Sequence, residues 1–429
     1  MRKQSVRRQA AVLACANGAV RALGFLLHVA LGRMLGAEAL GVFELAHSAH
    51  MLAVTPVTAG LPTAVSRLTA RRGDGAALAA GRRLAVRAGA ALALLWLALS
   101  PGIAGLLGDP RTLPALWACA PCVLFSGLGA VYHGYCYGQG RAWPPAWATL
   151  TEQAARFLLC VLLLIPGLTV AGRAAVPGAA ETLGEVAALG VLLLLLRGSL
   201  PGSMPRDKGL EKELLLLSLP LTGTRLIQTA SRALLSGLLP RRLVAAGMPP
   251  TQATAAVGLL HGMVLPVIFL PGILTAAIGM AGIPALARRE GPALRRMASQ
   301  LFLSSLACGL MGWAAISGLS GFLADTVYHQ PALRGLFRAA APLTLLFALG
   351  QAAATLLSGL GQQKKTLLPT LAGTALLLIC TYRWAASPLR LYGAIRAMLV
   401  ARAATVLWEL AAALPLLTPS AAPEALSDG

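Results

Sequence analysis

Residues 258–288 read GLLHGMVLPVIFLPGILTAAIGMAGIPALAR, and this stretch decides the fold. It is almost wholly apolar and exceeds the roughly 20 helical residues that cross the hydrocarbon core of a bilayer. Pro266, Pro271 and Pro284 interrupt it. In a membrane helix such prolines are tolerated where neighbouring helices or polar side chains satisfy the freed carbonyls. We therefore expect a bent, packed transmembrane helix that ends in a basic patch.

The composition extends this interpretation to the whole chain. Of its 429 residues, 57% are hydrophobic and 12% are charged, whereas about a quarter of the residues of a soluble domain are charged. The mean hydropathy is +0.72. These values predict an all-α polytopic membrane protein. The first apolar run, 10–31, is too long for the core of a signal peptide, so we expect a transmembrane helix there and no cleavable signal peptide.

About twelve apolar segments follow one another along the chain. If the N-terminus is cytoplasmic, 21 of the 36 basic residues fall in internal loops and nine in external loops. This bias follows the positive-inside rule and predicts a multi-pass plasma-membrane protein with cytoplasmic N- and C-termini. It also assigns the net charge of +21 to topology rather than to nucleic-acid binding. The expected segments are 10–31, 42–65, 85–107, 113–136, 148–167, 175–196, 213–239, 253–286, 298–322, 339–360, 366–384 and 391–416.

A polar segment rich in Pro, Gly, Ser and charge predicts a division of the chain into two halves. We expect an N-terminal six-helix lobe at 1–197, a cytoplasmic linker at 198–212, a C-terminal six-helix lobe at 213–416 and a disordered cytoplasmic tail at 417–429.

Two pairs of short motifs indicate that the halves are repeats. Residues 60–62 (GLP) align with 282–284 (GIP) at an offset of 222, and 138–140 (GQG) align with 359–361 (GLG) at an offset of 221. Six helices bring the second copy back to the same side of the membrane, so the repeats are parallel. Two such lobes are expected to enclose a central cavity, where transporter sites usually lie.

Ionisable side chains inside membrane helices are costly and are therefore candidate functional residues. Arginine occurs on the first and seventh helices, which are equivalent in the repeat, and its donor fork suits an anionic head group such as a phosphate. Prolines 62, 266, 271 and 284 are assigned to helix bends. The candidate substrate-binding residues are Arg21, Glu44, Arg225, Gln228, Arg232 and His261.

Purely structural roles for these candidates also remain open. Arg21, Arg225 and Arg232 are placed where a long side chain can snorkel to the membrane surface. Glu44 can cap its helix or pair with Arg33, and His261 can serve packing alone.

No motif predicts an enzyme, a metal site or a cofactor. The chain has no HExxH, GxSxG or Walker A motif. Cys119 and Cys122 form a CxxC, but they lie on an apolar helix without the polar surroundings and further ligands of a redox or zinc site. We interpret them as packing residues and expect no catalytic residues.

Several stretches resemble the stage V sporulation protein B family, a branch of the multidrug/oligosaccharidyl-lipid/polysaccharide exporter superfamily. They are LPRRL at 239–243, GLLHGMVLP at 258–266, LP at 270–271, and the N-terminal stretches 17–46 and 59–70. The resemblance implies a V-shaped bundle of two six-helix lobes. In the related lipid II flippases, arginines on the first helix and polar residues on the second line the cavity. Arg21 and Glu44 match these by helix.

The resemblance also implies a function. Members of this kind move a lipid-linked saccharide, such as the undecaprenyl-pyrophosphate-linked peptidoglycan precursor, and sporulating members act in spore cortex formation. The expected partners are a lipid-linked saccharide with an anionic head group, membrane lipids and, as further candidates, cell-wall synthesis enzymes. Many relatives have fourteen helices, the last two forming a lipid groove, whereas only twelve segments are counted here.

The leading hypothesis is therefore a flippase or exporter that works by alternating access in cell-wall or spore cortex synthesis. Two alternatives remain open. One is a multidrug cation antiporter of the same superfamily, which the excess of arginine over carboxylate in the helices disfavours. The other is a non-transporting membrane scaffold for cell-wall enzymes.

Overall fold

The structure, a computed structural model, describes residues 2–201, 207–286 and 290–416, without the side chains of residues 2–17, 280, 281, 284, 285 and 363. The predicted tail at 417–429 and part of the predicted linker lie outside the described residues. The described residues form helices joined by turns, with no strand among them. The prediction of an all-α fold is confirmed.

The chain is a multi-pass membrane protein. Ten helical stretches of the described residues are long and apolar enough to cross a membrane. One of them, Gly18–Arg72, contains most of the first predicted segment and all of the second. The chain changes direction within it at Gly36, where φ is 72°, a conformation that glycine adopts without strain. The seventh predicted segment, 213–239, lies within helix α8, Lys208–Ala245.

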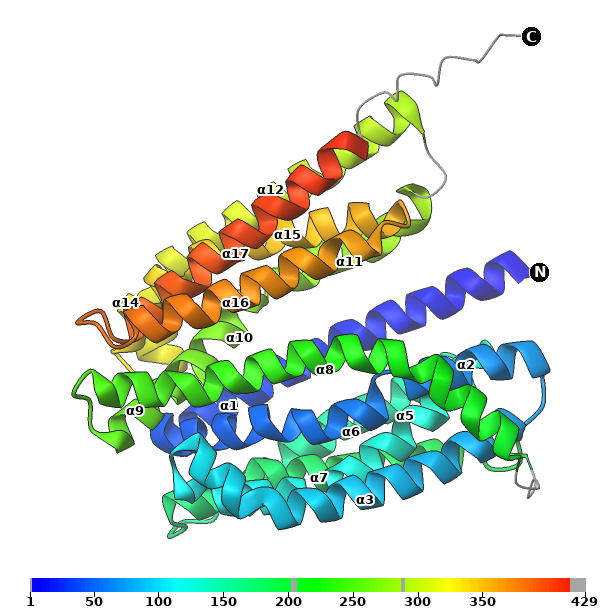
Figure 1. Ribbon diagram of the computed structural model, residues 1–429, viewed down its shortest axis with the longest axis horizontal. Coiled ribbons are helices and arrows are strands. Elements are labelled where there is room, and N and C mark those ends of the chain that lie inside the picture. Colours follow the sequence, from blue (N-terminus) through cyan, green and yellow to red (C-terminus); the bar gives the residue numbers. More distant parts are fainter. Residues whose placement is uncertain (1, 202–206, 287–289, 417–429) are drawn as a thin grey trace, which may run out of the picture. The chain divides into compact units, whose positions relative to one another are not determined.

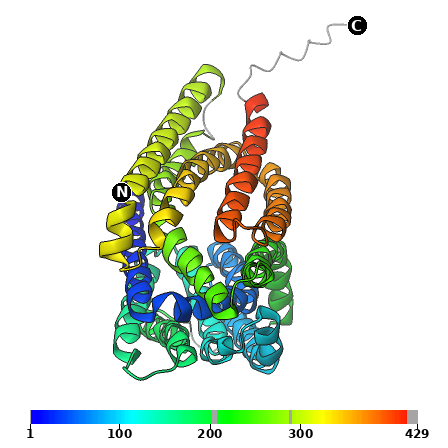
Figure 2. The ribbon, with the colours of Figure 1, turned by 90° about the vertical axis from the view of Figure 1, so that its left-hand side faces the viewer.

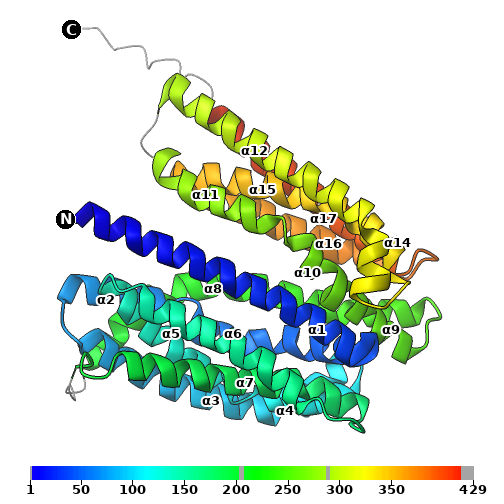
Figure 3. The same cartoon turned by 180° about the vertical axis from the view of Figure 1, so that it is seen from behind.

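Packing divides the chain into two compact units, 1–263 and 264–429. The first unit is built around α1, which contacts α5, α6, α7, α8 and α9 (Figures 1 and 3). Figure 2 views several helices of this unit nearly end-on. Its elements are α1 (Arg2–Thr58), α2 (Leu61–Arg72), α3 (Ala76–Leu107), η1 (Pro110–Thr112), α4 (Leu113–Cys119), α5 (Cys122–Gly138), α6 (Trp143–Leu163), α7 (Val170–Leu195), α8, α9 (Pro250–Val257) and most of the π-helix η2 (Gly258–Val264).

Apolar side chains from five helices form the core at one end of this unit. Val65 of α2, Ala80 of α3, Val131 of α5, Leu192 of α7 and Leu214 of α8 are each fully buried there. Since α2, α3, α5 and α7 precede the predicted linker and α8 follows it, burial of this cluster holds α8 to the first unit.

Two glycines allow α1 and the α9–η2 segment to touch backbone to backbone. A Cβ atom on Gly41 would lie 2.0 Å from the Thr254 carbonyl oxygen, and one on Gly258 would lie 2.0 Å from the Ala37 carbonyl oxygen. Neither contact is possible for a residue with a side chain, so this crossing requires glycine at both positions.

The second unit packs α12 against α15, α15 against α11 and α17, and α16 against α17 (Figures 1 and 3). Leu286, Ala298, Ala352, Leu356 and Ala413 are buried in its core. Its elements are α10 (Leu265–Phe269), α11 (Gly272–Leu286), α12 (Gly291–Gly318), α13 (Ser320–Phe322), η3 (Leu323–Val327), α14 (Leu333–Ala340), α15 (Pro342–Gly359), η4 (Gln363–Thr366), α16 (Leu367–Trp384), α17 (Leu391–Ala413) and η5 (Leu414–Leu416).

The division by packing and the predicted division at 198–212 fall at different places. Helices α8 and α9 come after the predicted linker but pack in the first unit. A repeat boundary records which segments are equivalent, whereas a packing boundary records which side chains touch. The boundary of the repeats therefore stays a prediction.

The prolines assigned to bends all lie at or near the ends of helices as the structure describes them. Pro62 is in the first turn of α2 and Pro266 is in the first turn of α10. Pro271 separates α10 from α11. Pro284 lies within α11.

Candidate functional site

A polar cavity lies between α1 and α8 in the first unit. Its volume is about 320 Å³, and it is lined by Thr55 and Thr58 of α1, by Ala59 directly after α1, and by Arg225 and Thr229 of α8. The hydroxyls of Thr55 and Thr229 are 3.1 Å apart. We call this the arginine cavity.

The threonine hydroxyls of the arginine cavity are held by their own helices. Thr58 Oγ donates to the Val54 carbonyl at 3.0 Å, and Thr229 Oγ donates to the Arg225 carbonyl at 2.9 Å. A hydroxyl that donates to its own helix keeps lone pairs for another donor. The Arg225 guanidinium, which is exposed, has no carboxylate within 4 Å in the part of the chain that the structure describes. The cavity therefore offers cationic donors beside neutral acceptors.

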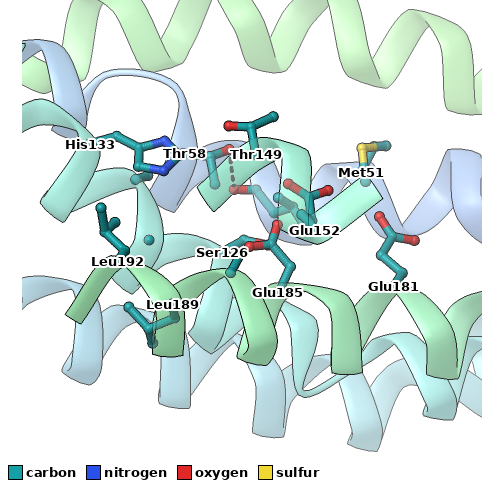
Figure 4. Close-up of a pocket in the computed structure, with 14 residues that line it drawn as sticks. Met51, Thr58, Ser126, His133, Thr149, Glu152, Glu181, Glu185, Leu189 and Leu192 are labelled. Atoms are coloured by element: carbon teal, nitrogen blue, oxygen red, sulfur yellow. Dashed lines mark hydrogen bonds between the residues drawn. The ribbon is translucent and has the colours of Figure 1, made fainter. Parts of the chain in front are cut away.

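A second cavity of about 370 Å³ lies between α1, α5, α6 and α7, and we call it the acidic cavity. Figure 4 shows Glu152 extending from α6, and Glu181 and Glu185 from α7, toward this space. Met51 and Thr58 of α1 line it as well, so Thr58 borders both cavities.

The three carboxylates of the acidic cavity have different partners. Arg156 of α6 lies 3.5 Å from Glu152 and 3.7 Å from Glu181. His47 Nδ1 of α1 lies 3.2 Å from Glu181 Oε2. Glu185 instead accepts a hydrogen bond of 2.6 Å from the Ser126 hydroxyl of α5. Among the described residues no cation lies within 4 Å of Glu185.

Glu181 and His50 are the most deeply buried polar groups near this cavity. Glu181 is 6% exposed and His50 is 0% exposed. Neither ring nitrogen of His50 has a hydrogen-bond partner in the described part of the chain, and its ring packs edge-on against Trp96 at 5.6 Å. Buried polar groups without partners are uncommon and mark a site of strain or function.

The predicted substrate-binding residues all lie in the first unit. Arg21 is exposed on α1, and Glu44 is partly buried on the same helix. Gln228 and Arg232 are exposed on α8, and His261 lies in η2, 3.5 Å from the Ser236 hydroxyl. Of the six, only Arg225 lines one of the two cavities described above. The roles of the other five stay predictions.

The sequence interpretation missed Glu181, Glu185 and Ser126. A signal was present, because Glu181 and Glu185 stand one turn apart inside an apolar helix, and a carboxylate there is a candidate by the same rule that selected Arg225. Glu152 and Arg156 stand one turn apart on α6, so their pairing can be read from the sequence, but the contact of Glu181 with the same arginine requires the tertiary fold.

In the described residues, no three His, Cys, Asp or Glu side chains converge as metal ligands would. Cys119 and Cys122 are both buried and unbonded to each other. The Cys122 thiol lies 3.3 Å from the Ser126 hydroxyl, so it borders the acidic cavity as a packing neighbour.

Known proteins resemble this chain in sequence and in fold. Stage V sporulation protein B of Bacillus subtilis (strain 168) is 28% identical over 371 residues, which cover 81% of this chain and 71% of the relative. The solved structure of the lipid II flippase MurJ, in an inward closed conformation, matches with a TM-score of 0.76 at 12% identity, covering 93% of this chain and 87% of that one.

A transporter structure of a second kind matches comparably well. It is an inward-facing multidrug resistance MATE family transporter of the MOP superfamily, with a TM-score of 0.71 at 17% identity, covering 94% of this chain and 96% of that one. Such low identities speak to the fold alone. The family model of polysaccharide biosynthesis proteins matches residues 6–290, and the resemblance predicted from the sequence is confirmed. Because that model spans more than half of the chain, the chain belongs to the family of polysaccharide biosynthesis proteins.

Proposed function

We propose that this protein is a flippase that moves a lipid-linked saccharide with an anionic head group across the plasma membrane by alternating access. The relatives support this proposal, since one is a stage V sporulation protein and another is a lipid II flippase. In the proposed topology both termini are cytoplasmic, and the six-helix repeats 1–197 and 213–416 form the two moving lobes. The protein has no catalytic residues in this role.

The arginine cavity is the observation that carries the proposal. Its volume of about 320 Å³ falls within the range of small-molecule sites, about 300–1,000 Å³. Arg225 supplies a permanent positive charge and a planar fork of donors for a phosphate oxygen. The hydroxyl oxygens of Thr55, Thr58 and Thr229 can accept from the hydroxyls of a sugar. A sugar phosphate needs both kinds of partner side by side.

The test is flipping of a labelled lipid-linked saccharide in proteoliposomes, read as loss of label accessibility to an impermeant reagent. A hydrogen bond to a charged group contributes about 1.5–3 kcal/mol, so Arg225→Ala is expected to slow flipping at least about tenfold. Arg225→Lys keeps the charge without the fork and should retain part of the rate. Arg67→Ala, on an exposed arginine of α2, is the matched control and should flip normally.

Two outcomes would favour the rivals. Full activity of Arg225→Ala would refute the head-group role of this arginine. Absence of flipping together with transport of a cationic dye would favour the multidrug antiporter, for which the acidic cavity is the supporting feature. Absence of both activities would favour a scaffold for cell-wall enzymes.

A further inference from the structure

We propose that the acidic cavity binds a proton at Glu185, and that this protonation strengthens binding of an anion in the neighbouring arginine cavity. The proposal rests on the proposed function only for its second part, since the proton site stands on the acidic cavity alone. It follows from the charge balance of that cavity, from the partners of each carboxylate and from the helix segment that the two cavities share.

The charge balance of the acidic cavity is negative. Glu152, Glu181 and Glu185 line it. In the described part of the chain they are paired with one arginine, Arg156, and one histidine, His47. Burying charge without compensation inside a membrane protein is costly, so such a group takes up a counter-charge or becomes neutral. The cavity is therefore built to acquire positive charge.

The donor arrangement favours a proton over a metal ion. Within the described residues no three carboxylate, imidazole or thiol groups lie close enough together to hold a metal ion, whereas a bound metal ion needs several ligands around one point. A single carboxyl group needs only one acceptor or donor nearby to hold a proton. For Glu185 this neighbour is the Ser126 hydroxyl, 2.6 Å from Oε1 of the carboxyl group.

Glu185 is the carboxylate that is left to carry the proton. Glu181 is held by Arg156 and His47, and Glu152 is held by Arg156 at 3.5 Å and by the Gln153 amide at 3.1 Å. These partners stabilise the ionised forms of Glu181 and Glu152. Glu185 lacks such a cation in the described residues and faces their negative charge, which favours its neutral form.

Titratable groups line the acidic cavity or lie near it on every helix packed around it. Besides Glu185, they are Glu44, His47 and His50 on α1, Cys119 on α4, Cys122 and His133 on α5, Glu152 and Arg156 on α6, and Glu181 on α7. Glu181 supplies a second observation, because it is 6% exposed and its Oε2 atom makes no hydrogen bond among the described residues. That oxygen has ionic contacts with His47 Nδ1 at 3.2 Å and Arg156 Nη2 at 3.7 Å, so it can still accept a hydrogen bond from an occupant of the cavity.

The last turns of α1, from Met51 to Thr58, together with Ala59 directly after them, link the two cavities. Met51, Val54 and Thr58 line the acidic cavity, and Thr55, Thr58 and Ala59 line the arginine cavity. Pro56 lies within this segment and has no N–H to bond the carbonyl one turn earlier. Negative charge in the acidic cavity opposes an anion beside Arg225, so neutralising Glu185 should favour that anion. Linkage makes the effect reciprocal, so a bound anion should also favour the proton.

The first experiment detects the proton. Infrared difference spectra of the purified full chain, recorded between about pH 5 and about pH 8, should show a protonated-carboxyl band that disappears with rising pH. The band should be absent in Glu185→Gln and present in Glu213→Gln, a control at an exposed carboxylate of α8. Should Glu185→Gln fail to fold, Ser126→Ala replaces it and should shift the midpoint of the band. A band unchanged in both variants would overturn the proton site.

The second experiment measures the linkage with inorganic sulfate, whose charge is constant over this range of pH. Wild-type protein should bind sulfate about tenfold more tightly at the acidic end of the range. Glu185→Gln should bind it tightly at all pH values, and Arg225→Ala should lose sulfate binding while keeping the infrared band. Sulfate affinity that is independent of pH in the wild type would overturn the linkage. If the wild-type protein shows the infrared band and the pH-dependent sulfate binding but does not flip a lipid-linked saccharide, the proposed function is refuted and the proton site is not.

Discussion

Replacing Asp109 is predicted to destabilise the first unit strongly, because this carboxylate ties α9 to the turn between α3 and η1. Asp109 is 7% exposed. It accepts hydrogen bonds from the Arg111 backbone N–H at 3.0 Å, from Arg111 Nε at 2.9 Å and from Arg111 Nη2 at 2.8 Å. It accepts a fourth from the Thr254 hydroxyl of α9 at 2.9 Å.

The size of the effect follows from these partners. Removing one member of a buried ion pair costs about 3–5 kcal/mol. Arg111 is 30% exposed and keeps Glu38 as a second partner, which places the expected loss for Asp109→Ala at the lower end. We expect a loss of about 3 kcal/mol, or a fall in melting temperature of about 6–12 °C for a unit of this size.

The pH dependence has a definite sign. Burial alone would raise the pKa of Asp109, but the hydrogen bonds from Arg111 and Thr254 outweigh it and lower that pKa. A carboxyl group whose pKa is depressed in the folded state contributes stability above its unfolded pKa of about 3.9 and loses it as pH falls through the folded value. The difference between wild type and Asp109→Asn should be constant at neutral pH and shrink only below about pH 4.

The assay is thermal unfolding of the purified full chain in detergent. Asp325→Ala is the matched control, since Asp325 also pairs with an arginine, Arg334, but their side chains are 40% and 53% exposed. Exposed pairs contribute about 0–1 kcal/mol. Equal losses in the two variants, or an Asp109 effect that titrates near neutral pH, would refute the reasoning.

Three further stability predictions use the same assay. Gly41→Ala should cost at least about 1–3 kcal/mol, because the new methyl group would overlap the Thr254 carbonyl; Gly102→Ala, with nothing within 4 Å, should be neutral or slightly stabilising. Trp96→Phe should cost about 1 kcal/mol, since it leaves the Leu116 carbonyl without its indole donor at 3.1 Å. Arg156→Met should cost about 3–5 kcal/mol by stranding buried carboxylates, and Arg156→Lys should recover part; a stable Arg156→Met protein would contradict the ion-pair assignment.

The sequence predicted the fold well because hydropathy is a local property. Each predicted segment falls on one or more helices. What the structure adds is the position of the breaks between helices inside a segment. The segment 42–65 runs over the end of α1 at Thr58 and the start of α2 at Leu61. The segment 113–136 contains the junction of α4 and α5. A hydropathy window averages over such breaks and cannot place them.

The site could be predicted only in part, because it depends on contacts distant in sequence. Arg225 was selected from its cost in a membrane helix, and it lines a cavity. The sequence shows that Thr55 and Thr58 share one face of their helix, but it does not show that this face meets Arg225 and Thr229. The acidic cavity depends on Glu185 meeting Ser126 and on Glu181 meeting His47, which no spacing within one helix reveals.

The stretch 258–288 and the two cavities are connected through α1. The first residues of that stretch pack on α1 so closely that a side chain at position 258 would overlap Ala37 and one at position 262 would overlap Leu40. The cavities lie further along the same helix, between Met51 and Ala59. The crossing allows little displacement where Gly41 and Gly258 meet, because backbone touches backbone there with no side chain between them. The crossing therefore fixes α1 just after its bend at Gly36, and the segment with Pro56 that borders both cavities lies between this fixed point and the end of the helix at Thr58.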